Sequence, residues 1–270
     1  MTNKTWFKGT IFVLTAVLTL TACSGKTSAQ SGGKENPATD FSYDLTADSQ
    51  GILIKGYTGG PGKVVIPAKI EDLPVLEIED RVFDGESFTW SANINTGSTS
   101  VETKTNKNAG ITSITIPDTV RKIGIGAFSN TAITSFNMPD SVTEIGLSLF
   151  SGCTALTEVR LSDNIEEIND RYGTGLFGLG GSSSLKKFNL PKNLKRIGTR
   201  AFSGLSELTE LVIPDGMTVE FGVINTYDGW LKEGTRYYGD VITSDAFKNC
   251  GKLPLATRQK LKDLGYIGEF

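Results

Sequence analysis

Apolar residues recur between residues 111 and 250 in a three-part pattern whose strand starts are spaced 22, 23, 29 and 23 residues apart. Each copy begins with a short alternating strand, continues with an apolar-x-x-Ile element that usually ends in Gly, and closes with a small or apolar residue followed by Phe. The first copy contains Ile114, Ile116 and Pro117, then Val120, Ile123 and Gly124, then Ala127 and Phe128. Five strand starts are legible, at Ile111, Ile133, Leu156, Leu185 and Leu208.

A unit of this size has one apolar side and cannot bury it alone, so such units stack and share one continuous core. Alternation along a strand directs the fourth and sixth positions of each unit inward and the third and fifth outward. Proline after the strand cannot donate a ladder hydrogen bond and therefore ends the pairing there. The pattern predicts a solenoid of mostly short β-strands and turns, with the repeated Phe filling the far side of the core.

The consensus sequence of the repeat, strand-Ile-Pro-Asp-x-Val-x-x-Ile-Gly-x-x-Ala-Phe, resembles the BspA-like leucine-rich repeats of the Treponema type. Upstream residues such as Phe41, Tyr43, Gly51 and Tyr57 resemble that family's capping hairpin, and residues 65–83 resemble its first repeat. The resemblance implies a leucine-rich-repeat solenoid over residues 40–270 and, in function, attachment to host proteins or other cells.

The stretch from Leu253 to Tyr266 loses the strand pattern and places Leu255, Leu261 and Leu264 at near-helical spacing. We expect this stretch to form a carboxy-terminal capping helix. Gly265 is suited to end it, because glycine adopts the left-handed conformation of a helix stop.

The first 39 residues indicate export rather than folding. Lys4 and Lys8 precede an apolar run, residues 11–20, that is too short to span a bilayer. The run ends in Leu-Thr-Ala-Cys, which resembles a bacterial lipobox. We predict a signal peptide at residues 1–22, lipidation of Cys23, and a flexible polar tether over residues 23–39. The expected location is the bacterial cell envelope, lipid-anchored and exposed on the outer leaflet.

Composition excludes several functions. The chain has no histidine, which removes the commonest general base and zinc ligand. Without the two lysines of the signal, 25 basic residues face 30 acidic ones, and no basic cluster could follow a phosphate backbone. We therefore expect no enzyme activity, cofactor, metal site or nucleic-acid partner. The remaining enzymatic alternative is a hydrolase using Glu77 with Glu79 or Asp245, but these acids are scattered over different coil turns.

Cys153 and Cys250 occupy the same column of the repeat, three coils apart. At about 4.8 Å per coil they are separated by roughly 14 Å, about twice the reach of a disulfide. We predict two buried thiols.

Two insertions, residues 88–110 and 218–240, interrupt the coils. Tyr and Trp are frequent in binding hot spots because they supply rigid contact area at low entropic cost. The alternative is that these rings fold back and cover the flank of the solenoid. The aromatic candidates for ligand binding are Trp90 in the first insertion and Phe221, Tyr227, Trp230, Tyr237 and Tyr238 in the second.

The outward strand face is a further candidate surface, with Glu158 and Arg160 among its residues. The alternative is that this face is only solvated, because no row of aromatic residues or of charges of one sign runs along it. The leading functional hypothesis is a cell-surface lipoprotein that binds a protein ligand, such as an extracellular-matrix protein or another bacterial surface protein. The alternative is a periplasmic scaffold that organises envelope partners without host contact.

Overall fold

The computed structural model describes residues 33–93, 98–168, 175–177, 184–222, 224–225 and 242–270. The chain divides into two compact units, Met1–Ser31 and Gly32–Phe270. Only the second contains described residues, and it has one continuous hydrophobic core. The predicted signal peptide and Cys23 therefore lie outside the described residues.

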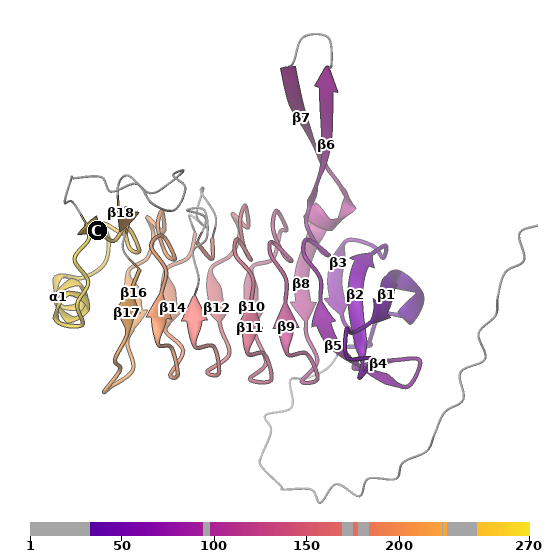
Figure 1. Ribbon diagram of the computed structural model, residues 1–270, viewed down its shortest axis with the longest axis horizontal. Helices are drawn as coiled ribbons and strands as arrows, with labels where there is room; N and C mark the ends of the chain where they lie inside the picture. Colours follow the sequence, from indigo (N-terminus) through magenta and orange to yellow (C-terminus); the bar gives the residue numbers. More distant parts are fainter. Residues whose placement is uncertain (1–32, 94–97, 169–174, 178–183, 223, 226–241) are drawn as a thin grey trace, which may run out of the picture. The chain divides into compact units, whose positions relative to one another are not determined.

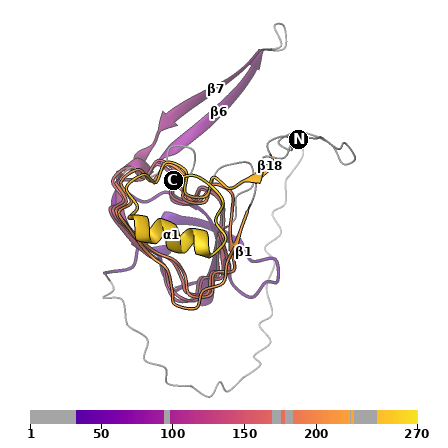
Figure 2. The same cartoon turned by 90° about the vertical axis from the view of Figure 1, so that its left-hand side faces the viewer.

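Each coil of the second unit contributes a strand to a parallel ladder, and the coils superimpose when viewed along the stack (Figure 2). The pairing joins β10 to β12, β12 to β14 and β14 to β16, with Phe136, Val159, Phe188 and Leu211 in register. These inward residues are buried, whereas most of their strand neighbours are exposed, as alternation predicts. The strands are β10 (Ser135–Asn137), β12 (Glu158–Arg160), β14 (Lys187–Asn189) and β16 (Glu210–Val212), preceded by the parallel pair β3 (Gly62–Val65) and β8 (Ile111–Thr115).

The Ile-Gly elements form a second set of two-residue parallel strands along the stack (Figure 1). Their members are β9 (Lys122–Ile123) and β11 (Glu144–Ile145), which continue from β5 (Leu73–Ile78), and β13 (Glu167–Ile168), β15 (Arg196–Ile197) and β17 (Glu220–Phe221). Glycine follows most of these strands because the preceding coil lies against it. A Cβ on Gly146 would lie 2.3 Å from the backbone nitrogen of Ile125.

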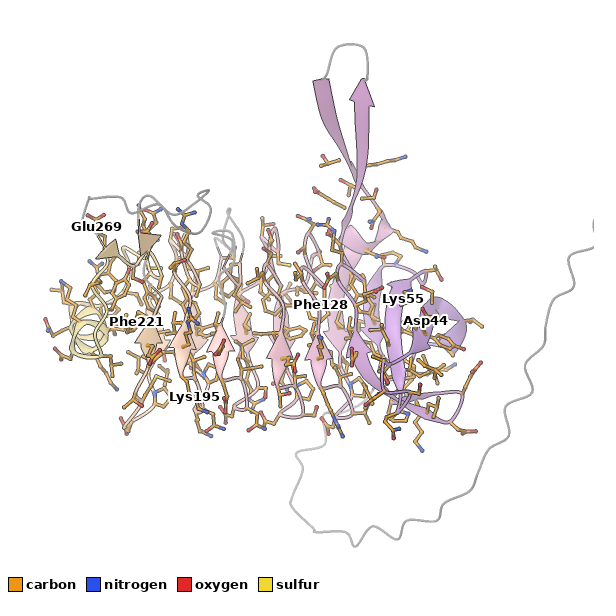
Figure 3. All side chains as sticks on the ribbon, viewed as in Figure 1. Asp44, Lys55, Phe128, Lys195, Phe221 and Glu269 are labelled. Atoms are coloured by element: carbon orange, nitrogen blue, oxygen red, sulfur yellow. The ribbon has the colours of Figure 1, made fainter. Side chains whose placement is uncertain are left out.

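A column of phenylalanines fills the opposite side of the core, one for each coil. Phe128, labelled in Figure 3, has its ring centroid 5.9 Å from that of Phe83 and 6.0 Å from that of Phe150. The column continues through Phe177, Phe202 and Phe247 at centroid distances of 6.0, 6.4 and 5.1 Å. Every member is buried, so the third part of the repeat is a core element, as predicted.

The amino-terminal end of the stack is an antiparallel hairpin of β1 (Phe41–Leu45) and β2 (Ile52–Tyr57), and β2 pairs in parallel with β5. The short β4 (Lys69–Ile70) folds back onto β5, and η1 (Ala38–Asp40) precedes β1. The folded unit begins earlier than predicted. Asn36, expected in the tether, donates its N–H to the carbonyl of Val65 and accepts the Val65 N–H through its side chain, at 2.9 and 2.8 Å.

The carboxy-terminal end is covered by α1 (Leu255–Asp263). Leu261 is buried and Leu264 is half-buried, whereas Leu255, the first residue of the helix, is 82% exposed. Gly265 ends the helix as predicted. Its φ is +100°, and the N–H groups of Gly265 and Tyr266 donate to the carbonyls of Lys262 and Leu261.

Candidate interaction edge

The three longest insertions of this unit enter the coils at the same edge, between an Ile-Gly element and the strand that follows it, whereas the short turn with β4 lies between β3 and β5. We call this region, which contains the phenylalanine column, the insertion edge. The first insertion leaves the turn after Phe83, the extra residues of the third copy lie between Ile168 and Ser184, and the last enters between Gly222 and Ser244. In repeat solenoids, insertions that gather on one face often mark the binding face.

The first insertion is a regular antiparallel hairpin of β6 (Glu86–Asn93) and β7 (Ser98–Thr105), with eight paired residues on each strand. It projects away from the coils (Figures 1 and 2), and η2 (Lys107–Gly110) returns the chain to β8. Trp90 lies in β6 opposite Val101. Its side chain is outside the described residues.

Buried polar contacts fix the root of this hairpin. Asp84 is 3% exposed and forms an ion pair with Arg81. Its Oδ1 accepts the Glu86 N–H at 2.9 Å and an Asn130 side-chain N–H at 3.0 Å. These bonds connect the first residue of the hairpin to the next coil. They also offset the desolvation of the buried carboxylate.

The second strand of the hairpin is held at the same place. Asn106 donates its backbone N–H to the carbonyl of Gly85 and its side-chain N–H to the carbonyl of Asp84, at 2.9 and 3.0 Å. Gly85 also packs so closely that a Cβ there would lie 1.8 Å from the carbonyl oxygen of Asn130. The hairpin therefore leaves the solenoid in a fixed direction. Sequence reasoning missed this root, although Asp84-Gly85 departs visibly from the corresponding Ser129-Asn130.

The second insertion begins later than predicted. Met217 is buried, and Glu220 and Phe221 pair with Arg196 and Ile197, so residues 218–222 complete a regular coil. The sequence concealed this element because Met217 and Phe221 are four positions apart, whereas Val142 and Ile145 are three apart. A pair of two-residue strands, β18 (Ile224–Asn225) and β19 (Ile242–Thr243), then joins the two ends of the insertion.

Phe221 is half-buried and packs against the core, so it lies in a regular coil and not in the insertion where the sequence placed it. Its ring centroid lies 6.4 Å from that of Phe247 and 5.4 Å from that of Tyr266, and Figure 3 shows it within the last coil. The other predicted ligand contacts of this insertion lie outside the described residues. They are Tyr227, Trp230, Tyr237 and Tyr238.

The outward strand faces carry charges of alternating sign. Glu158, Lys187 and Glu210 are successive neighbours in one ladder, and Lys187 lies 2.5 Å from Glu210. In the second ladder the successions are Glu77, Lys122, Glu144 and Glu167, Arg196, Glu220. Within the described coils each of these columns alternates in sign and keeps one net negative charge, which favours the solvated-face alternative over a single-sign docking stripe.

The two cysteines are buried thiols, as predicted. The Cys153 Sγ donates to the carbonyl of Phe128 at 3.1 Å, and the Cys250 Sγ donates to that of Phe202 at 3.2 Å. Burial raises the pKa of both thiols, to about 12 for Cys250. Both are therefore held in the unreactive, protonated form at neutral pH.

Two of the acids considered for hydrolysis, Glu77 and Asp245, lie in different coils and do not share a site. Glu77 lies in β5 and Asp245 precedes Phe247 in the last coil, so the intervening coils separate them. A cavity of about 190 Å³ lies between β16 and α1, lined by Leu211, Ile213, Ala256, Thr257 and Lys260, and contains none of these acids. Over the described residues, no group of three or more Cys, Asp or Glu side chains is placed to hold a metal ion. Nor does the described part include a helix long and apolar enough to cross a membrane.

A model of the BspA-type leucine-rich repeat region matches residues 76–172 and 177–222 in six copies, which together make up more than half of the chain. The chain belongs to the BspA-type leucine-rich-repeat family. The family match extends to Gly222, in agreement with the coil that β17 completes. No protein of curated function matches this BspA-type chain.

The chain is similar to several solved structures, of which the first shows the same fold. The leucine-rich-repeat protein of T. pallidum is 26% identical, with 88% of this BspA-type chain and 99% of that chain covered and a TM-score of 0.59. A leucine-rich-repeat protein from Bacteroides ovatus is 21% identical, with 68% and 54% covered and a TM-score of 0.38. A leucine-rich cell surface protein from Faecalibacterium prausnitzii is 22% identical, with 70% and 55% covered and a TM-score of 0.34.

Proposed function

We propose that this protein is a cell-surface lipoprotein that binds a protein ligand through its insertion edge, in adhesion to host proteins or in attachment between cells. The observation that carries the proposal is the gathering of the three longest insertions at one edge of otherwise regular coils. Membership of a repeat family whose stacked coils present extended binding surfaces supports it. The lipobox-like Leu-Thr-Ala-Cys at residues 20–23 supports an anchor at Cys23.

Construction of the edge also supports this role. At the root of the β6–β7 hairpin, a buried carboxylate and several hydrogen bonds hold the hairpin in one orientation. An interaction element fixed before binding loses less conformational entropy when its ligand arrives. Tyr227, Trp230, Tyr237 and Tyr238, together with Trp90, are the aromatic residues we propose for ligand contact. No catalytic step, cofactor or metal belongs to the proposal.

The test is binding of the unit Gly32–Phe270 to a panel of extracellular-matrix and bacterial surface proteins, measured by biolayer interferometry. One variant replaces residues 226–241 with a short Gly-Ser turn, which keeps β18, β19 and Phe221. A matched control changes Glu158→Ser and Asn189→Ala on the outward strand face, where both residues are exposed. We expect the first variant to lose binding and the second to retain it. Loss in the control alone would move the site to the strand face.

Cellular location is tested separately by protease treatment of intact cells. Cleavage on whole cells supports the surface role. A domain that is cut only after lysis contradicts it, and crosslinking that recovers envelope proteins would then favour the periplasmic scaffold.

A further inference from the structure

The hairpin β6–β7 is a two-stranded sheet, and neither strand pairs with any other strand of the described residues. It is also the longest uninterrupted pairing in this part of the chain. A two-stranded ribbon is marginally stable alone, because neither of its faces is covered and both outer edges present unpaired backbone groups. The hairpin therefore has the geometry of an incomplete sheet.

The outer edge of β6 lacks the features by which proteins normally block strand addition. Natural edges are protected by charged side chains, proline or bulges. From Ser87 to Val101 the chain contains no charged residue and no proline, and the pairing of β6 with β7 runs without a register shift. The one charged residue of β6 is Glu86 at its start, whereas β7 contains Glu102 and Lys104 within the strand. The unprotected edge is that of β6.

The two faces of the ribbon differ in composition. The pairing places Phe88, Trp90 and Ala92 on one face, with Val101 opposite Trp90. The other face carries serine and threonine at most positions, including Thr89, Ser91 and Ser100. A strand added at β6 would extend the apolar face only if its own residues alternate in the same way and carry no charge opposite that face.

A second copy of β6 meets these requirements. We propose that β6 pairs antiparallel with β6 of a second copy, in a register centred on Thr89, so that the two hairpins form one four-stranded sheet. In this register Phe88 of each copy lies opposite Trp90 of the other, an aromatic cross-strand pair that occurs twice. Glu86 lies opposite Ala92, so no like charges meet. This dimer uses Trp90, which the proposed function also assigns to ligand contact, but it leaves the four aromatic residues of the last insertion free.

The experiment compares the mass of the unit Gly32–Phe270 with that of two lysine variants over a concentration series, by sedimentation equilibrium. In Thr89→Lys the introduced lysine lies opposite Glu102 within the hairpin, which preserves that pairing. Across the proposed axis it meets the same lysine of the second copy. Ser100→Lys is the matched control, on the same face of the ribbon but on β7. We expect the unchanged protein and Ser100→Lys to dimerise and Thr89→Lys to remain monomeric.

A charge-reversed partner makes the test specific. Thr89→Glu combined with Glu102→Lys keeps an opposite-charge pair inside the hairpin and repels its own copy across the axis. Mixed in equal amounts with Thr89→Lys, it should restore the dimer. A monomeric unchanged protein, a dimer that persists in Thr89→Lys, or a mixture that stays monomeric would each overturn the proposal. If the unchanged protein is monomeric and the β6 amides gain exchange protection only when a protein ligand is added, the edge instead receives a strand of that ligand.

Discussion

The two ends of the stack are closed by different means. At the amino-terminal end a hairpin continues the parallel sheet, so β2 satisfies the open edge of β5 by backbone hydrogen bonds. At the carboxy-terminal end the helix α1 covers the last coil, and the rings of Phe221, Phe247 and Tyr266 close the phenylalanine column. One end is thus closed mainly by main-chain pairing and the other by side-chain packing. Substitutions of single side chains should therefore weaken the carboxy-terminal end more.

The largest effect is expected for Tyr266→Ala. The side chain is 2% exposed, and its ring contacts three aromatic rings of the last coil and tail. Removing a buried aromatic ring costs about 3–5 kcal/mol of unfolding free energy. Urea unfolding of Gly32–Phe270 measures the loss. Leu255→Ser, in the same helix but at an exposed position, is the matched control and should change stability by less than about 0.5 kcal/mol.

A smaller effect is expected for Ile54→Ala at the opposite end. Ile54 is fully buried in β2, and its truncation should cost about 2–4 kcal/mol. Because coils contact mainly their neighbours, the loss should appear as faster hydrogen exchange in β1, β2 and β5. Equal acceleration in α1 would show that the two ends unfold as one unit and would contradict the comparison.

Alkaline pH should also loosen the carboxy-terminal end. Burial raises the pKa of Tyr266, and it raises the pKa of the Cys250 thiol to about 12. Asp245 and Glu269 near Tyr266 add to the increase for the phenol. Both groups are neutral in the fold, so their stabilisation is complete below the unfolded pKa values, 9.0 for the thiol and 10.0 for the phenol, and is lost as pH rises toward the folded values.

Hydrogen exchange of α1 across this pH range, corrected for the intrinsic rate, measures the loss. In the double variant Tyr266→Phe, Cys250→Ala the pH dependence should weaken. If it does not, other groups control the alkaline response.

The smallest effect is expected for Gly265→Ala. Glycine at φ +100° allows the turn that directs Tyr266 back into the core, and an L-residue there is strained. We expect a loss of about 1–2 kcal/mol. No atom lies near the added Cβ, so the strain is conformational and not steric. Gly265→Asn should lose less than Gly265→Ala, since asparagine tolerates this region better, and an equal loss would contradict the explanation.

Sequence predicted the solenoid well because its core is periodic. Once Ile114 or Phe128 is assigned to the core, the repeat length identifies the equivalent core residue of every other coil. The exceptions are the places where the count fails. Phe221 looked like an insertion residue because one extra residue precedes it, and Asn36 looked like tether because its role rests on hydrogen bonds to Val65 and not on apolar burial.

The insertion edge was less predictable from the sequence than the core. The insertions were visible as breaks in the period, but the root of the first depends on Asp84, Gly85, Asn106 and Asn130 meeting across separate turns. Polar contacts of this kind have no period along the chain. The sequence could therefore locate the insertion, but not the bonds that fix its direction.

The alternating charges on the ladders also constrain how such a chain can change its length. Deleting the coil that contains Lys187 would bring Glu158 beside Glu210, and like charges on adjacent strands repel. The same holds for Arg196 between Glu167 and Glu220. In the second ladder the pairing of the described strands stops between β11 and β13, where Glu144 and Glu167 would meet. Removing the coil of Lys187 and Arg196 together with the coil of Glu210 and Glu220 would avoid both contacts between like charges. This part of the stack should therefore tolerate the loss of that pair of coils better than the loss of the Lys187 coil alone.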